Sequence, residues 1–272
     1  MSLPAVAKKA FQDTVRSRGM VVLVALFSLL VAVFAYVIRP QGGQADQFAT
    51  ELLLSAFVGP VLVTGLVPLV GVVVGYNAVS GERESGSLKL LLSLPHSRAD
   101  VVFGKVVGRG AALALATLAG FLLPAAVLVA TPVTFNAGSY LGYTVFAAAL
   151  GVVFVAIAVG GSAAVATRQR ALIAGIAVYA LFVLMWGLFT GRVIGAFGGP
   201  VEALPISMGE IRTFLDVANP TTGVEVLANA FLADQLFSGD QMNRQISAVA
   251  MLLFWTLAPP LFGLLKFERD DL

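Results

Sequence analysis

Six long apolar runs constrain the fold of this chain more than any other feature. A helix needs about 20 apolar residues to cross the hydrocarbon core of a bilayer. In lipid the backbone must satisfy its own hydrogen bonds, so each run is expected to be helical. The sequence therefore predicts six transmembrane helices, over residues 20–38, 52–75, 110–131, 140–166, 171–191 and 246–265.

The charge content excludes a soluble protein. Only 12% of the 272 residues are charged and 58% are hydrophobic, whereas soluble domains carry about 25% charged residues. The period-two alternation of half-buried strands is absent. The expected fold class is all-α, with one polytopic membrane domain over residues 1–272 whose first run is an uncleaved anchor.

The Lys and Arg residues outside the runs predict the orientation in the membrane. Six crossings place both termini on one side, and that side carries thirteen of the 17 Lys and Arg residues. Cytoplasmic loops are enriched in these residues, so we expect a multi-pass protein of the cell membrane with both termini in the cytoplasm. A basic inner face suits anionic membrane lipids, and nothing indicates nucleic-acid binding.

Two segments outside the runs have amphipathic helical patterns. In residues 1–19 the apolar side chains share one face, which predicts a cytoplasmic interface helix; a plain extension of the first span is the alternative. Residues 192–245 contain two apolar stripes separated by Asn219, a helix cap, and Pro220, the first residue of the next helix. This extracytoplasmic loop is expected either to lie at the membrane interface or to pack as an ordinary surface loop.

The segment 77–109 is the only sizeable cytoplasmic surface between the spans. Ser80 is expected to cap a short helical turn. Glu82 and Glu84 follow it and suit the positive N-terminal end of that turn. Gly86 is expected to end it.

The second half of this segment has further helix signals. Ser87 is expected to cap a second short helix that ends at Pro95. Ser97 and Asp100 have the spacing of a capping box, which predicts the start of the helix that enters the third span. The segment is suited either to docking a soluble partner or to forming a solvated hairpin between two spans.

Several kinds of site are absent from the sequence. No GxxxxGK[ST] occurs, so the chain has no P-loop for ATP, and neither HExxH nor GxSxG occurs. With no cysteine and the single histidine His96, neither a metal site nor a cofactor is expected. The six methionines are scattered, so the spans offer no ladder of soft ligands for Cu(I), and we do not expect the chain to conduct copper ions.

The spans also lack ionisable residues away from their ends. Ion-coupled transporters keep carboxylates, histidines or cations within the membrane. Their absence disfavours a proton- or sodium-driven transporter, so any transport would draw its energy from a partner.

The stretch GYNAVSGERESGSLKLLLSLPHSRADVVFGKVVGR resembles the signature of type-2 ABC transporter permease subunits. The order of the whole chain is also similar: an N-terminal interface helix, six spans, and a longer outer loop before the last span. Many members have an acid where Asn77 stands. Within the family, the chain is similar to permeases of the nitrous-oxide-reductase maturation cluster, which are often labelled copper-related. The positions that match the signature are Ser80, Glu82, Glu84, Gly86, Ser87, Leu88, Leu91, Leu92, Pro95, Ser97, Arg98, Gly104 and Lys105.

The resemblance implies the membrane half of an ATP-driven exporter of a hydrophobic or complex substrate. It implies a separate ATP-binding-cassette ATPase, which hydrolyses ATP, and a second permease chain, identical or different, around a central path. No catalytic residue is expected in this chain. The residues implied in coupling to the ATPase are Ser80, Glu82, Arg83, Glu84, Gly86, Ser87, Leu88, Leu91, Pro95, Ser97, Arg98 and Lys105.

Two other classes of function remain open from the sequence. One is a non-transporting scaffold subunit of a membrane complex. The other is an integral membrane enzyme, whose candidate residues are the acids of the outer loop: Glu202, Glu210, Asp216, Glu225, Asp234 and Asp240.

Overall fold

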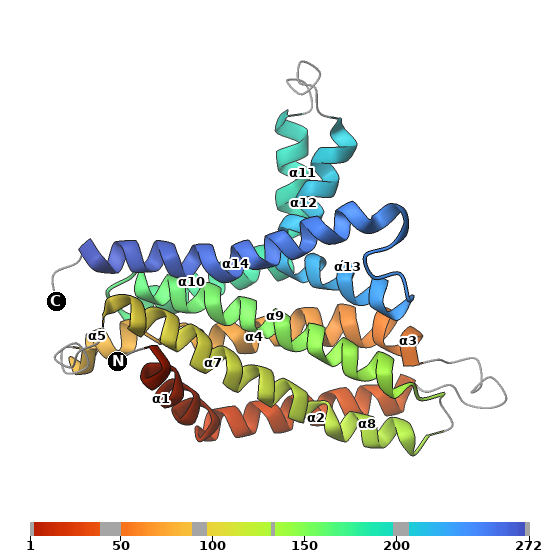
Figure 1. Ribbon diagram of the computed structural model, residues 1–272, viewed down its shortest axis with the longest axis horizontal. Helices are drawn as coiled ribbons and strands as arrows, with labels where there is room; N and C mark the ends of the chain where they lie inside the picture. Colours follow the sequence, from red (N-terminus) through yellow and green to blue (C-terminus); the bar gives the residue numbers. More distant parts are fainter. Residues whose placement is uncertain (1–2, 39–49, 89–96, 132–133, 198–206, 270–272) are drawn as a thin grey trace.

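The computed structural model describes residues 3–38, 50–88, 97–131, 134–197 and 207–269, and within these ranges every regular element is a helix. Most helices run along the long axis of the molecule, and the two ends of the chain lie at the same end of the bundle (Figure 1). Five of the described helices are long and apolar enough to cross a membrane, or six if one bent pair forms a single span. These observations confirm an all-α polytopic membrane protein.

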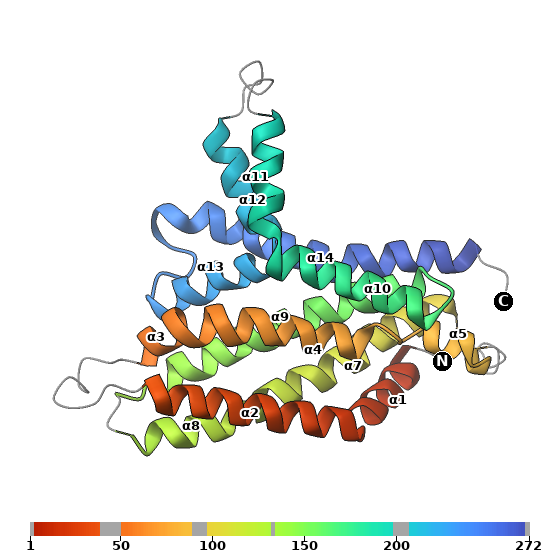
Figure 2. The same ribbon diagram turned by 180° about the vertical axis from the view of Figure 1, so that it is seen from behind.

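The N-terminal helix α1 (Leu3–Val15) forms as expected and meets α2 (Arg18–Ile38) at an angle (Figure 2). It lies across the first part of α7 (Arg98–Gly120). A Cβ atom on Gly108 of α7 would lie 2.3 Å from the carbonyl oxygen of Ala7. The missing side chain lets the two backbones approach closely, so α1 is part of the bundle as well as an amphipathic helix.

The second span is continuous from α3 (Thr50–Leu53) through the π-helical η2 (Leu54–Val63) to α4 (Thr64–Gly75). Pro60 lies within η2. Proline has no N–H group and blocks a regular α-helical turn, and short π-helical stretches absorb such defects.

The helix that enters the third span begins where the capping box predicts it. Helix α7 starts at Arg98 and continues into the apolar run from residue 110, and α8 (Leu122–Val129) follows after a break at Phe121. The capping box at Ser97 sets this start, which places Lys105 and Arg109 on the helix that enters the membrane.

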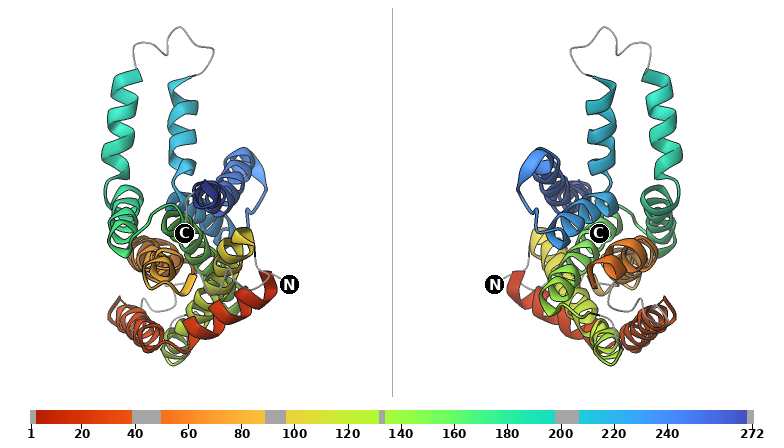
Figure 3. Two further views of the ribbon diagram at one scale, coloured as in Figure 1. Left: turned by 90° about the vertical axis from the view of Figure 1, so that its left-hand side faces the viewer. Right: turned by 90° about the vertical axis from the view of Figure 1, so that its right-hand side faces the viewer.

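Helix α9 (Ala137–Ala163) is the centre of the bundle, surrounded by α4, α7, α13 (Pro220–Leu232) and α14 (Met242–Arg269) (Figure 3). Small residues allow this crowding. A Cβ atom on Gly75 of α4 would lie 2.5 Å from the Cβ atom of Ala158.

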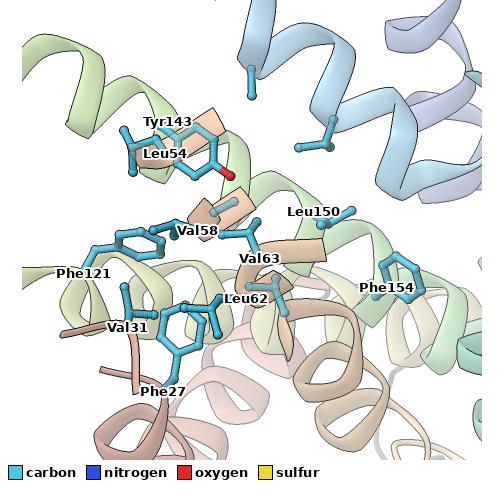
Figure 4. Close-up of a cluster of buried hydrophobic side chains, with 14 of the residues drawn as sticks. Phe27, Val31, Leu54, Val58, Leu62, Val63, Phe121, Tyr143, Leu150 and Phe154 are labelled. Carbon is cyan, nitrogen blue, oxygen red and sulfur yellow. The ribbon is translucent and has the colours of Figure 1, made fainter. Parts of the chain in front are cut away.

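The largest core cluster joins α2, η2, the α7–α8 junction and α9 (Figure 4). Burial of these aliphatic and aromatic side chains fixes the four elements against one another, because interiors tolerate few voids. The residues labelled there are Phe27, Val31, Leu54, Val58, Leu62, Val63, Phe121, Tyr143, Leu150 and Phe154.

The fifth predicted span, over residues 171–191, is not one straight helix. Helix α10 (Arg168–Tyr179) continues into the π-helical η3 (Ala180–Leu184), and α11 (Trp186–Phe197) then turns away by 75°. At the break the Met185 N–H donates to the Ala180 carbonyl, a π-type bond that changes the helix direction.

Helices α11 and α12 (Met208–Ala218) project sideways from the bundle as a hairpin (Figures 1 and 3). Asn219 ends α12 and caps α13 through the Thr221 N–H at 2.9 Å, and Pro220 is the first residue of α13, as predicted. The Asn219 side chain also donates to the Phe182 carbonyl at 2.8 Å, which returns the chain to the point where η3 ends.

Helix α13 then runs beside α9 toward the end of the bundle opposite the termini (Figure 1). A short turn, η5 (Gly239–Gln241), leads into α14, which returns along α9. The segment 192–245 thus combines part of a lateral hairpin with a helix of the bundle.

Candidate functional site

A group of bonded polar side chains surrounds the chain segment after α4, at the end of the bundle that carries the termini. There the chain leaves α4, forms the short helix α5 (Ser80–Glu84), and turns at Gly86, whose φ is +77°. Glycine adopts this left-handed conformation without strain, so Gly86 ends the helix as the sequence predicts. Of the expected second helix, only Ser87 and Leu88 are described, and both are helical. Leu91 and Pro95 lie outside the described residues.

Ser162 of α9 holds the start of α5. Its hydroxyl oxygen accepts from the backbone N–H groups of Val79 and Ser80, both at 3.1 Å. The Ser80 hydroxyl lies 3.0 Å from that of Ser162. Ser80 is fully buried and lies inside α5, so it joins α5 to α9 and does not cap the helix.

Lys105 of α7 holds the middle of α5. Its ammonium group pairs with the Glu82 carboxylate and donates to the Ala78 carbonyl. The Lys105 side chain is only 4% exposed, and that of Glu82 is 31% exposed. Removing one partner of a buried pair leaves a charge without compensation, so Glu82 stabilises the fold and is not a free surface acid.

Arg109, one turn further along α7, donates through Nη1 to the Val74 carbonyl and to the Asn77 side-chain oxygen. Asn77 stands where many family members have an acid, and here it accepts from a guanidinium group as a neutral amide. The end of α4 is thereby tied to α7.

Glu84 connects α5 to the fifth span. Its carboxylate accepts from the Arg168 N–H at 2.9 Å, at the N-terminus of α10, where a negative charge is favourable. The Arg168 side chain donates to the Gly81 carbonyl at 3.3 Å.

The capping box that starts α7 is formed as predicted, and it also holds α1. Ser97 accepts from the Asp100 N–H at 3.0 Å, and one Asp100 oxygen accepts from the Ser97 N–H, also at 3.0 Å. The other Asp100 oxygen accepts from the Leu3 N–H at 2.9 Å. A single carboxylate thus joins α1 to the segment.

Phe267 near the end of α14 is fully buried between two cations. The guanidinium groups of Arg83 and Arg98 lie 5.1 and 4.9 Å from its ring centre, within the range of cation–π attraction. Arg98 also donates to the Phe267 carbonyl. The last helix therefore meets the segment from α5 and from α7.

The described coupling residues differ in exposure: some are buried, some are partly exposed and some are exposed. Ser80, Leu88 and Lys105 are buried and hold the segment in place. Glu82, Arg83 and Arg98 are partly exposed, and four residues face outward: Glu84, Gly86, Ser87 and Ser97. Only the exposed part of the set is available to a partner.

Sequence reasoning missed three residues that hold this site: Ser162, Arg168 and Phe267. Ser162 is a polar residue within an apolar run, and Arg168 lies in the short TRQR connection, which are weak signals in sequence. Phe267 gives no signal, because a phenylalanine at the end of a span is ordinary.

The acids of the outer segment do not assemble into a catalytic or metal site. Glu210 belongs to a capping box with Ser207, Asp216 lies 4.0 Å from Arg244, and Glu225 faces a small cavity beside η2. Within the described ranges no three His, Cys, Asp or Glu residues are grouped to hold a metal ion.

Comparison with known proteins places the chain in a family. A family model described as "ABC-2 family transporter protein" matches residues 4–272. The chain is 31% identical over 187 residues to the "Probable ABC transporter permease protein NosY" of Pseudomonas aeruginosa, and 30% identical over 187 residues to the protein of the same description from Stutzerimonas stutzeri. Each match covers 67% of both chains. The bundle of five or six candidate membrane-spanning helices, the polar segment after its second span and these matches lead to one conclusion: the chain belongs to the ABC-2 transporter family and is a transmembrane permease subunit of an ABC transporter.

Proposed function

We propose that this permease is the membrane half of an exporter and that a separate ABC-type ATPase docks on one surface of it. That surface is formed by α1 and residues 77–109. The end of the bundle that carries it is cytoplasmic, with both termini. The proposal rests on the way in which α5 is held.

The observation that supports coupling is that α5 is bonded to spans far apart in the sequence. Ser162, Lys105 and Arg168 reach it from α9, α7 and α10. A displacement of α5 would therefore act on three spans together, because its anchors are specific side-chain bonds. A merely solvated hairpin would not need such anchors.

The exposed residues of the segment are the proposed contacts of the ATPase. Glu84, Gly86, Ser87 and Ser97 are exposed, and α5 lies at the same end of the bundle as α1 (Figure 1). The charge and shape of these exposed residues would determine which ATPase binds, since exposed charges act chiefly on the specificity and rate of association.

Cysteine cross-linking tests the docking surface, because the chain contains no cysteine. Ser87→Cys is exposed at the proposed surface, and Asp240→Cys in η5 is an exposed control at the opposite end of the bundle. With the partner ABC-type ATPase co-expressed, a short bifunctional reagent should join Ser87→Cys, and not Asp240→Cys, to the ATPase. The reverse result, or equal cross-linking at both sites, would place docking elsewhere.

Reporter fusions test the orientation. A fusion after Arg170 should be active as a cytoplasmic reporter, and a fusion after Gly239 should be external. The opposite outcome at either position would overturn the proposed topology, while leaving the bundle itself unaffected.

Export and a second permease chain complete the proposal. The apolar interior suits extrusion of a hydrophobic or complex substrate better than uptake of a small polar one.

Native mass spectrometry of the complex should give two permease chains with two ATPase subunits. In inside-out vesicles ATP should drive accumulation of a lipophilic probe, whereas ATP-driven release would indicate import.

A further inference from the structure

A cavity of about 290 Å³ lies between α1, α2, α4, α5 and α7, at the end of the bundle that carries the termini. Three of its lining residues are cations, Lys9, Lys105 and Arg109, and two are acids, Asp13 and Glu82. Asn77, Glu82, Lys105 and Arg109 of the candidate site line this cavity as well. The bonds described for that site leave the cavity itself unfilled.

The charges of the cavity are only partly compensated. Lys105 and Glu82 form an ion pair with each other. Arg109 makes both of its hydrogen bonds through Nη1, so within the described residues no protein group accepts from its other two nitrogens. Lys9 and Asp13 are exposed, and neither has an ion-pair partner within 4.0 Å in the described part of the chain. Apart from the Lys105–Glu82 pair, the cavity is lined by two cations, Lys9 and Arg109, and one acid, Asp13.

The wall of the cavity on the side of α2 and α4 is apolar. It is formed by Met20, Leu23, Val73 and Val74. Leu23 also borders a second apolar hollow between α2, α4 and α7, but that hollow has a volume of only about 20 Å³ and is too small to hold an acyl chain.

We propose that this cavity binds the phosphodiester headgroup of an anionic phospholipid and that an acyl chain of the lipid leaves it along the apolar wall. A guanidinium edge is the group best matched to phosphate oxygens. Basic pockets between transmembrane helices at the membrane surface recognise such headgroups. The apolar wall favours a lipid over a free phosphate, which would leave that surface uncovered.

The bound lipid would join α1 to the spans beside the ion pair that holds α5. This inference does not depend on the docking proposal, because it concerns a cavity within one chain. It also does not depend on the orientation, since both leaflets carry headgroups at this depth.

A binding measurement on the purified permease in neutral detergent tests the proposal. Dioctanoyl-phosphatidylglycerol should raise the unfolding temperature saturably, and native mass spectrometry should detect one tightly held molecule. Dioctanoyl-phosphatidylcholine should bind at least tenfold more weakly. Glycerol phosphate, which carries the same phosphate without acyl chains, should not stabilise the protein at the same concentrations.

Two variants and a control connect the binding to this cavity. Gly19 lines it, and nothing lies within 4 Å of a Cβ atom built there, so Gly19→Phe should fill the space and abolish binding. Lys9→Gln should weaken binding about fivefold, the usual contribution of one cation near a lipid surface. Lys8→Gln is the control, because Lys8 is an exposed neighbour that does not line the cavity.

The proposal is overturned if phosphatidylcholine binds as tightly as phosphatidylglycerol, or if Lys9→Gln and Lys8→Gln bind equally. Equal binding of glycerol phosphate would also overturn it in favour of a free-phosphate site. The exposed Lys9 variant keeps the test decisive even if Gly19→Phe does not fold.

Discussion

The end of the bundle around α5 and the lateral α11–α12 hairpin use similar residues in opposite ways. Around α5, polar side chains from α7, α9 and α10 reach the segment, and the glycines of the neighbouring helices lie against other backbones. In α11 the glycines at 187, 191 and 195 have nothing within 4 Å of a built Cβ atom. Gly104 and Gly108 of α7 are four residues apart, as are the successive glycines of α11. Only the neighbouring helices therefore distinguish a packing surface from an open one.

The same comparison applies to the capping boxes. Ser97 and Asp100 start α7 and also hold α1 through the Leu3 N–H. Ser207 and Glu210 start α12, and their side chains bond only to each other and to each other's backbone within the described residues. A local motif becomes a tertiary anchor only where a second element lies within reach of its spare oxygen.

The largest expected effect is at the buried ion pair. Glu82→Lys places two cations together and should lower the free energy of unfolding by about 3–5 kcal/mol, as removal of a partner from buried pairs does. Differential scanning fluorimetry in detergent measures this. Glu84→Lys removes an exposed carboxylate that accepts one backbone N–H, from Arg168, and should change the unfolding temperature much less. Equal losses in the two variants would contradict the distinction between an acid paired with a buried lysine and an exposed one.

The next effect compares Gly75 of α4 with Gly191 of α11, each of which lies four residues from another glycine. Gly75→Leu should destabilise the protein by about 1–3 kcal/mol or more, because its Cβ would meet Ala158 of α9 at 2.5 Å and overpacking displaces both helices. Gly191→Leu in the hairpin should leave the melting temperature unchanged or raise it slightly, since leucine favours a helix over glycine. Similar melting temperatures for both variants would remove the contrast between the two regions.

A smaller effect is expected at Ser162. Ser162→Ala leaves the N–H groups of Val79 and Ser80 without their acceptor in a buried place, which costs about 1–3 kcal/mol. Hydrogen exchange followed by mass spectrometry should show faster exchange over residues 79–84 and little change in the hairpin. Ser162→Thr keeps the hydroxyl and is the control. Unchanged exchange in Ser162→Ala would mean that α5 is held by its other bonds alone.

The smallest effect is expected at the two caps. Ser97→Ala should cost about 1 kcal/mol through loss of the N-cap. It should also expose α1 to proteolysis after Lys8 or Lys9, since Asp100 loses its orientation. Ser207→Ala should leave α1 protected. Limited trypsin digestion read by mass spectrometry distinguishes them, and identical digestion patterns would show that Asp100 holds α1 without its cap.

Much of the fold was predictable because its determinants are local. The apolar runs, the amphipathic first helix, the capping box at Ser97, the turn at Gly86, and the change of helix at Asn219 and Pro220 all depend on neighbouring residues. The break at Met185 was not predictable, because residues 171–191 form a single apolar run in which nothing marks a bend. The π-helical bond from Met185 depends on backbone geometry, and the bond from Asn219 to Phe182 joins residues 37 positions apart.

The candidate site was predictable in position but not in construction. The signature located the segment, and the resemblance implied its role as a set of residues. Its division into anchors and exposed residues came from partners at a distance, such as Lys105 for Glu82 and Arg168 for Glu84. A sequence pattern contains the residue types, but it does not contain burial.

By itself, the sequence determined that this chain spans a membrane as helices and that its polar segment follows the second span, because hydrophobicity and helix caps act over a few residues. Only the tertiary structure decided that Ser80 and Lys105 are buried and that Lys105 pairs with Glu82. It also decided that a cavity lined by three cations opens between α1 and α4, and that the fifth span turns aside at Met185. Those features depend on which helices become neighbours, and that is set by packing of the whole bundle around α9.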